Sequence, residues 1–170
     1  MNFSIVVATN KINGIGYNNN NTYTIPWKSK EDMMFFKKLT TGNDFENNAI
    51  IMGKNTYLSL NKELPNRKNI IISSTLKNDN LTIFKTLDEA LIFCKDNKIA
   101  NVFVIGGSLL YKEALTNKYL TKIYWNIIQN NNECNIFFPY TLDEYTKLKS
   151  LNIIDHKINE NVHYYTFEIF

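Results

Sequence analysis

The chain has 170 residues, of which 44% are hydrophobic, 14% aromatic and 21% charged. These proportions are typical of a packed globular protein and exclude a disordered or fibrous chain, and the length suits one hydrophobic core, so we expect a single domain over residues 1–170. The formal net charge is only +3 and the 19 Lys and Arg residues are scattered, so we expect no nucleic-acid partner.

Short apolar runs alternate along the chain with segments of helical period, a pattern that predicts strands covered by helices in an α/β domain. In chain order we expect strands over residues 3–8, 49–52, 69–73, 81–84, 102–105, 123–128 and 162–170. We expect helices over residues 29–39, 86–94 and 107–115, the first two opened by capping signals at Ser29 and Thr86.

The strand sequences predict how the sheet is covered. Ile70-Ile71-Ile72 is apolar at every position, as expected for a parallel strand with helices on both faces of the sheet. Residues 162–170 alternate instead, which suits a final antiparallel strand at the sheet edge. Residues 14–25 form the one conspicuous loop, and its run of Asn at 18–21 is too polar to bury, so we interpret this segment as a candidate mobile lid.

Sites for membranes, disulfides and metals are not expected. No apolar run approaches the roughly 18 residues of a membrane span, and the N-terminal stretch suits a buried strand better than a signal peptide. Cys94 and Cys134 cannot make a disulfide framework, and His156 and His163 lack helical ligand spacing. We therefore expect a cytoplasmic protein with no membrane partner and no metal.

Two glycine-containing turns share one predicted geometry. Gly53-Lys54-Asn55-Thr56 and Gly106-Gly107-Ser108 each follow an apolar strand and open a helix. At that edge of a parallel sheet, helix N-termini present N–H groups to anions, so two such turns suit a dinucleotide. Neither turn matches the three-glycine dinucleotide fingerprint or the phosphate loop, and the alternative is that the glycines only make tight turns.

Further short motifs surround these turns, and they are informative through their order and spacing. They are Ala8 through Gly14-Ile15-Gly16, Pro26-Trp27 with Asp32 five residues on, Phe36-Lys37, Ile51 through Thr56, Leu64 through Asn69, Ser73-Ser74, Val104 through Ser108 with Tyr111, Phe138-Pro139 and Tyr165 through Ile169. Together they resemble dihydrofolate reductase from Ser4 to Phe170.

The resemblance implies a fold and an activity. The fold is a single α/β domain with a central, mostly parallel eight-stranded sheet, an antiparallel C-terminal edge strand and helices on both faces. The activity is NADPH-dependent reduction of 7,8-dihydrofolate to tetrahydrofolate for one-carbon metabolism, by hydride transfer from nicotinamide C4 to pterin C6 with protonation at N5. We expect a monomer.

Asp32 is the predicted catalytic acid. It falls in the first turn of the helix opened by Ser29, so it could simply cap that helix. Its neighbours Met33 and Phe36 are apolar and predict a buried carboxylate, which could bind a pterin ring N–H and amine side by side. The resemblance gives Asp32 the role of polarising the pterin and promoting N5 protonation, with water as the proton source.

Arg67 is the only arginine in a chain that otherwise uses lysine. Its planar guanidinium suits a carboxylate, and the resemblance assigns it to the α-carboxylate of the glutamyl tail, with Lys37 assisting; chance or a structural ion pair is the alternative. The other predicted substrate residues are Val6, Trp27 (also expected to be catalytic), Phe36, Leu60, Leu64, Ile105 and Asn126. For Trp27, Phe36, Leu60, Leu64 and Ile105, plain core packing is the alternative.

The resemblance also implies a cofactor site. Lys54, Asn55 and Thr56 are expected on the phosphates, and Ser74 and Thr75 near the adenosine 2′-phosphate. The remaining predicted cofactor residues are Ala8, Ile15, Gly16, Gly53, Ser73, Gly106, Gly107, Ser108, Leu109, Leu110 and Tyr111. The Gly106–Gly107 bond is expected to be cis, as in the family.

Three departures from the family pattern stand out. The segment between Gly16 and Pro26 carries four more residues than is common. Asn126 takes the place of a threonine that bonds to the pterin-binding acid, and its amide has a different reach. Leu109 and Ser74 stand where some members have arginine, so the preference for NADPH over NADH is inherited from the family.

Two other functions are compatible with parts of this pattern. One is a reductase of the same fold that acts on a pyrimidine or another pterin precursor, and Arg67 together with Asp32 favours folate over it. The other is a nucleotide-binding sensor or scaffold without catalysis. The intact set of Asp32, Trp27 and Thr56 argues against that reading.

Overall fold

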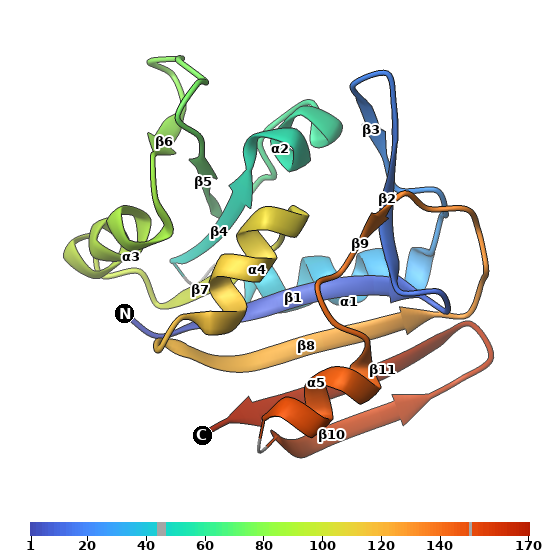
Figure 1. Ribbon diagram of the computed structural model, residues 1–170. Coiled ribbons are helices and arrows are strands. Elements are labelled where there is room, and N and C mark those ends of the chain that lie inside the picture. Colours follow the sequence, from blue (N-terminus) through green and yellow to red (C-terminus); the bar gives the residue numbers. More distant parts are fainter. Residues whose placement is uncertain (44–46, 150) are drawn as a thin grey trace.

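The computed structural model describes residues 1–43, 47–149 and 151–170 (Figure 1). Its strands are β1 (Phe3–Asn10), β2 (Gly14–Asn19), β3 (Thr22–Thr24), β4 (Asn48–Gly53), β5 (Lys68–Ile72), β6 (Thr82–Phe84), β7 (Asn101–Val104), β8 (Leu120–Ile128), β9 (Ile136–Phe137), β10 (Leu151–Ile158) and β11 (Val162–Ile169). Its helices are α1 (Lys30–Thr41), α2 (Lys54–Leu60), α3 (Leu87–Asp96), α4 (Ser108–Thr116) and α5 (Leu142–Leu148). The structure therefore confirms the predicted α/β class.

A central eight-stranded sheet organises the molecule, in the order β10-β11-β8-β1-β7-β4-β5-β6. From β8 to β6 every neighbouring pair is parallel, whereas β11 is antiparallel to β8 and to β10. The C-terminal strand is thus antiparallel as predicted, but β10 lies outside it and forms the edge. Sequence analysis missed β10 because almost all of its side chains are exposed and a register shift between Ile153 and Asp155 interrupts its pattern.

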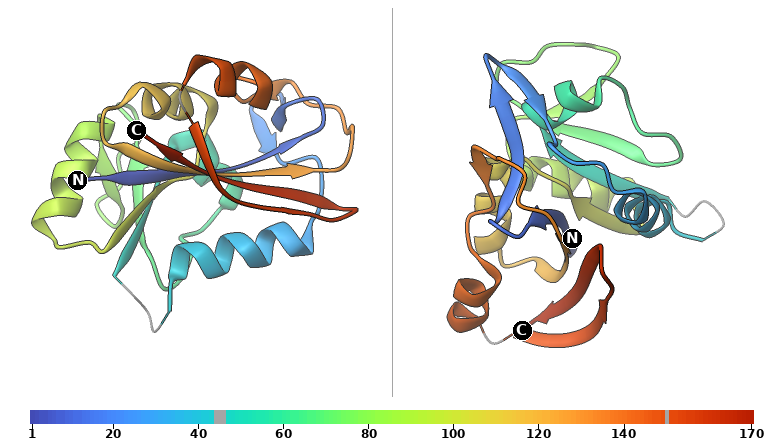
Figure 2. Two further views of the ribbon diagram at one scale, coloured as in Figure 1. Left: turned by 90° about the horizontal axis from the view of Figure 1, so that it is seen from below. Right: turned by 90° about the vertical axis from the view of Figure 1, so that its right-hand side faces the viewer.

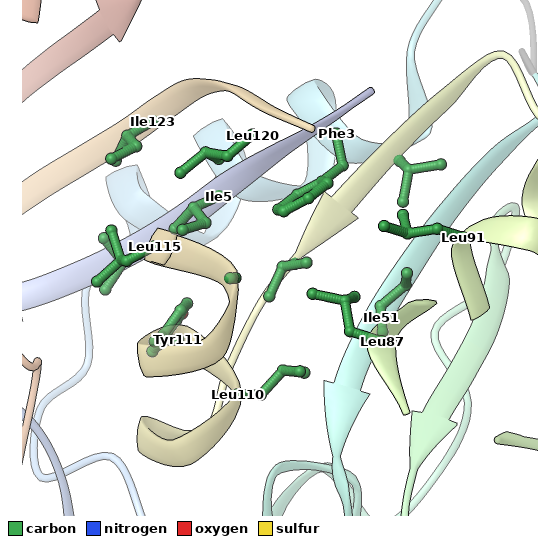
Figure 3. Close-up of a cluster of buried hydrophobic side chains, with 14 of the residues drawn as sticks. Phe3, Ile5, Ile51, Leu87, Leu91, Leu110, Tyr111, Leu115, Leu120 and Ile123 are labelled. Atoms are coloured by element: carbon green, nitrogen blue, oxygen red, sulfur yellow. The ribbon is translucent and has the colours of Figure 1, made fainter. Parts of the chain in front are cut away.

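Helices pack on both faces of this sheet, as Figure 2 shows. On one face, α3, α4 and α5 cover the larger core, whose side chains near β1 and α4 appear in Figure 3. On the other face, α1 and α2 pack over a smaller cluster centred on Val6, Ile50, Met52, Ile71 and Phe103. The smaller cluster positions the candidate site, because α1 lies directly over it.

Side-chain caps fix where the predicted helices begin. The Ser29 side chain accepts from the backbone N–H of Asp32, and Thr86 forms a capping box with Glu89. The start of α1 is therefore held at the residue that carries the predicted catalytic acid. Within the described ranges, no helix is long and apolar enough to cross a membrane.

The predicted loop over residues 14–25 is wrong, since β2 and β3 form a hairpin there. Asn20 and Asn21 make its two-residue turn with φ of 46° and 66°, a left-handed conformation that Asn tolerates well. β2 also pairs with β9, so a small three-stranded sheet stands beside the main one (Figure 1). Gly14 lies so close to Cys134 that an added Cβ would overlap the thiol.

Candidate active site

The site begins at Asp32 in the first turn of α1. Its Oδ1 accepts a hydrogen bond of 2.8 Å from Nδ2 of Asn126 on β8, and Asn126 is only 2% exposed. Burial raises the pKa of the Asp32 carboxyl above its ordinary value, and the bond from Asn126 opposes that rise. The bond from Asn126 fixes the position of this carboxyl against β8.

The strands beneath Asp32 bring further predicted residues together. Asn126 pairs with Ala8 of β1 in register, and the hydroxyl of Tyr111 donates to the backbone oxygen of Val6 at 2.8 Å. Burial and the nearby charge of Asp32 raise the pKa of Tyr111, so this hydroxyl stays protonated. The predicted role of Met33 as a wall of the acid's pocket is wrong, because its side chain is 67% exposed on the outer side of α1.

A stripe along α1 leads away from the acid. Asp32, Phe36 and Thr40 are spaced four residues apart, so they follow one face of the helix over about 12 Å. The Arg67 guanidinium lies over the Phe36 ring, 5.8 Å from its centroid, and donates to Thr40 Oγ1 at 2.8 Å. An acid and an arginine therefore stand at opposite ends of one apolar stripe.

Some of the N–H groups of Arg67 bond within the chain and others remain available to a ligand. Its Nε donates to the backbone oxygen of Pro65 at 3.0 Å, so two of the five N–H groups of a guanidinium are used. Among the described residues no carboxylate lies within 4 Å of Arg67, which excludes an ion pair there. Burial lowers the pKa of Arg67, although a guanidinium remains charged at neutral pH. The remaining N–H groups can bind an external carboxylate.

Asn69 fixes the loop that presents Arg67. Its side chain accepts from the N–H of Leu64 at 2.9 Å and donates to the oxygens of Leu64 and Arg67 at 2.8 and 3.0 Å. Leu64 and Leu60 pack in the same cluster as Phe36. These three predicted channel residues therefore share one apolar surface between the acid and the arginine, to which Val6 and Ile105 also belong.

The two glycine-containing turns meet at the carboxyl edge of β4 and β7. The N–H of Gly53 donates to the oxygen of Gly106 at 2.7 Å, and the Gly106–Gly107 bond is cis, as expected. An added Cβ on Gly53 would lie 3.4 Å from the nitrogen of Gly107, and one on Gly106 or Gly107 would lie 3.4 Å from Thr56 Oγ1. The two turns form one joint surface whose backbone a ligand can approach closely.

A cationic corner lies beside these turns. Lys54 Nζ donates to Thr75 Oγ1 at 3.2 Å, and Ser73 Oγ accepts from the N–H groups of Thr75 and Leu76 at 3.2 and 2.9 Å. In the described part of the chain, no carboxylate lies within 4 Å of Lys54. Its charge is available to an anion that reaches this corner.

A protein-family model described as dihydrofolate reductase matches residues 2–170. The chain belongs to the dihydrofolate reductase family. This membership confirms the predicted enzyme class, an oxidoreductase of dihydrofolate, and it implies use of a nicotinamide cofactor.

Relatives support this membership across nearly the whole chain. A dihydrofolate reductase of Buchnera aphidicola is 36% identical over 174 residues, covering 99% of this chain and 98% of the relative. One from Drosophila melanogaster is 29% identical over 156 residues, covering 86% and 84%. A bifunctional dihydrofolate reductase-thymidylate synthase of Paramecium tetraurelia is 35% identical over 173 residues, covering 95% of this chain but only 35% of the relative. The chain thus spans about a third of that bifunctional protein.

The other predicted residues of the dihydrofolate reductase site differ in how exposed they are. Trp27 is half-buried between β3 and α1, and Lys37 is exposed beside a hollow of about 460 Å³ on the outer side of α1 that does not include Asp32. Leu109 is 85% exposed, whereas Leu110 packs in the core under α4. Ligand contacts at these positions stay predictions. The same holds for Ile15, Gly16, Asn55, Ser74 and Ser108.

Two residues that shape the site escaped sequence analysis. Thr40 is fully buried and supports Arg67, and Asn69 holds the loop before β5. The spacing of Thr40 from Asp32 was the available signal, since residues eight apart share a helix face. Asn69 stands in the motif from Leu64 to Asn69, but its structural role was not predicted, because its bonds to Leu64 and Arg67 depend on the turn between them.

Proposed function

We propose that this chain reduces 7,8-dihydrofolate to 5,6,7,8-tetrahydrofolate with NADPH as the hydride donor. The observation that carries the proposal is the stripe from Asp32 through Phe36 to Arg67. Its ends match the two ends of a folate, a heterocycle with adjacent N–H donors and a glutamyl carboxylate, and its middle is apolar like the aminobenzoyl group. A pyrimidine substrate has no tail that would require Arg67.

Asp32 binds and polarises the heterocycle. Its carboxylate accepts the ring N–H and one N–H of the adjacent amine, bonds that are strong because the acceptor is charged. The negative charge beside these N–H groups pushes electron density into the heterocycle, which raises the basicity of N5 and favours its protonation by water as C6 is reduced.

The other substrate residues fix the position of the folate. Arg67 binds the α-carboxylate of the tail with its free N–H groups, and Lys37 adds positive charge at the exposed end. Phe36, Leu60 and Leu64 flank the aminobenzoyl group. Val6, Ile105, Asn126 and Trp27 enclose the pterin.

The joint turns and the cationic corner fit a phosphorylated dinucleotide. The glycine backbone of residues 53 and 106–107 leaves space that a side chain would fill, and Thr56 Oγ1 lies at that surface. Lys54, with Ser73, Ser74 and Thr75, supplies a cation and hydroxyls for the adenosine 2′-phosphate, which supports NADPH over NADH. When bound, NADPH supplies the hydride that pterin C6 receives.

The proposal also covers the setting of the reaction. Residues 1–170 act as one catalytic domain, monomeric and cytoplasmic, without nucleic-acid partners. Sedimentation of the purified protein at micromolar concentration tests the monomer, since a single species of the chain mass is expected.

The decisive assay follows absorbance at the nicotinamide band. Purified protein with NADPH and dihydrofolate should lose absorbance at a rate proportional to enzyme concentration, and NADH should be a poorer donor. No loss of absorbance with a folded protein would refute the activity. Equal rates with NADPH and NADH would refute only the role of Lys54 at the adenosine 2′-phosphate and would leave the reductase activity standing.

A further inference from the structure

The sequence contains a single Asn-Gly pair, Asn13–Gly14, at the point where β2 begins. In such a pair the backbone nitrogen of Gly14 can attack the side-chain Cγ of Asn13, because glycine places no side chain beside that nitrogen. The new N–C bond closes a succinimide ring, and the side-chain nitrogen leaves as ammonia. Water then opens the ring at either carbonyl and yields aspartate or isoaspartate.

Both reacting groups are held by hydrogen bonds in the folded chain. The N–H of Gly14 donates to Oδ1 of Asn10 at 2.9 Å in a buried contact. Nδ2 of Asn13 donates to the backbone oxygen of Phe138 at 3.0 Å, and the N–H of Phe138 donates to the oxygen of Asn13 at 3.1 Å. The attacking nitrogen must lose its proton and the side-chain amide must turn toward it, so the bonds to Asn10 and Phe138 have to break first.

The pairing of β2 with β9 keeps these bonds in place. Gly14 is buried and pairs in register with Phe137. Just before β9, Asn135 adds two bonds to the backbone of Asn18: its Oδ1 accepts from the N–H at 2.7 Å, and its Nδ2 donates to the oxygen at 2.8 Å. Separation of β2 from β9 would therefore free Asn13 and Gly14 to react.

The product cannot restore the bond that the Asn13 side chain makes. An ionised aspartate has acceptors only, so its carboxylate would face the oxygen of Phe138 without a proton between them. The φ of Asn13 is 64°, a left-handed conformation that aspartate also tolerates, so the lost donor is the main difference. Phe138 packs on the rings of Trp125 and Tyr111, so its bond to Asn13 ties β2 to the main core.

We propose that Asn13–Gly14 is a modification site that reacts only when β2 separates from β9, and that its deamidation then favours the separated state. Opening of the small sheet is thereby recorded as a permanent covalent change. The inference goes beyond the proposed function and does not depend on it, because the reaction uses only the chain and water. The modified pair directly precedes Ile15 and Gly16, which are predicted cofactor residues.

The first test measures deamidation of Asn13 by peptide mass spectrometry. Folded protein and the same chain unfolded in guanidinium chloride are incubated at mildly alkaline pH. If only a separated state populated at roughly 0.1–10% can react, the folded chain should deamidate roughly 10- to 1000-fold more slowly than the unfolded one. Asn80, which precedes the bulky Leu81, is the internal control and should react far more slowly than Asn13 in the unfolded chain.

Asn135→Ala tests the gate without touching the reacting pair. The variant loses only two exposed bonds to Asn18. Deamidation of Asn13 in the folded chain should become about tenfold faster, because both bonds hold the closed state, and should stay unchanged in guanidinium chloride. Asn97→Ala removes a similar exposed bond to the oxygen of Phe93 at the end of α3 and should keep the wild-type rate.

Asn13→Asp tests the effect of the product. Hydrogen exchange of the backbone amides of residues 14–19 should be about tenfold faster than in the wild-type protein, because the donor to Phe138 is lost and two acceptors face each other. Asn66→Asp makes the same change at another left-handed Asn, with φ of 63°, outside the small sheet. This control should leave exchange of residues 14–19 unchanged.

The outcomes decide each part of the inference. Equal deamidation rates in the folded and unfolded chains, or a folded Asn135→Ala variant no faster than the wild type, overturn the gate. No deamidation of Asn13 in the unfolded chain overturns the site itself. Unchanged hydrogen exchange in Asn13→Asp overturns the effect of the product. A slow reaction in the folded chain that Asn135→Ala accelerates, with faster exchange in Asn13→Asp, supports the inference.

Discussion

The two faces of α1 carry consecutive acids in opposite environments. On the inner face, burial raises the pKa of Asp32, which bonds to Asn126. On the outer face, bonds from Asn161 and Asn159 lower the pKa of the exposed Glu31. The helix rotation between neighbours, and not the residue type, decides which carboxylate can meet a ligand and which one only ties α1 to the turn before β11.

The strongest test of this contrast replaces each acid by its amide. Asp32→Asn should lower kcat roughly 100-fold while NADPH binding stays nearly unchanged, because a preorganised charge at the pterin is removed. Glu31→Gln should keep kcat near the wild-type value. Steady-state kinetics and cofactor titration measure both effects. Similar kcat values for the two variants would contradict the difference between the faces.

The far end of the inner face is tested by Arg67→Lys. An ammonium keeps the charge but cannot bind a carboxylate bidentately, so KM for dihydrofolate should rise about tenfold with kcat within about twofold. Steady-state kinetics with saturating NADPH give both constants. A collapse of kcat with unchanged KM would place Arg67 in the chemical step and not on the tail.

A smaller effect is expected at Thr40, which touches Arg67 and not the substrate. Thr40→Val removes the acceptor of the 2.8 Å bond and leaves Arg67 less restrained. We expect KM for dihydrofolate to rise about threefold without a change in kcat. If Thr40→Val matched the effect of Arg67→Lys, the pose of Arg67 and not its fork geometry would dominate tail binding.

The two faces should also differ in the pH dependence of stability, the smallest effect. Because the pKa of Asp32 is raised above 3.8, the folded state binds the extra proton, and the unfolding free energy due to Asp32 falls as pH rises above 3.8. Because the pKa of Glu31 is lowered below 4.5, its contribution is present above 4.5 and lost as pH falls. The free energy of unfolding is measured with denaturant between about pH 3 and pH 7. The decrease with rising pH should be absent in Asp32→Asn, and the decrease with falling pH that is due to Glu31 should be absent in Glu31→Gln.

Sequence patterns predicted the features that depend on residues close together in the chain, such as helix starts and buried strands. Ser29 set the start of α1 and Thr86 that of α3, and the apolar runs located the parallel strands. The glycines of the two turns do meet at one edge, because carboxyl ends of parallel strands converge there. The burial of Asp32 was expected, although the reason offered through Met33 was wrong.

The missed features are those that depend on tertiary partners. The β2–β3 hairpin has polar side chains on a ribbon that projects from the main sheet, so it lacks an apolar run. Helix α5 has only seven residues, too few for a visible period, although Thr141 caps it. The hydrogen bond between Thr40 and Arg67 joins residues 27 positions apart, so the spacing of Thr40 from Asp32 places it on the inner face of α1 without revealing its partner.

The tight contact of Gly14 with Cys134 gives the molecule an internal chemical reporter. Burial raises the pKa of both thiols, that of Cys94 to about 11, so neither reacts readily while the protein is folded. Cys94 lies in the main core, whereas Cys134 lies where β2 meets the segment before β9. Alkylation of Cys134 ahead of Cys94 therefore reports separation of the small sheet alone, and equal rates report unfolding of the whole chain.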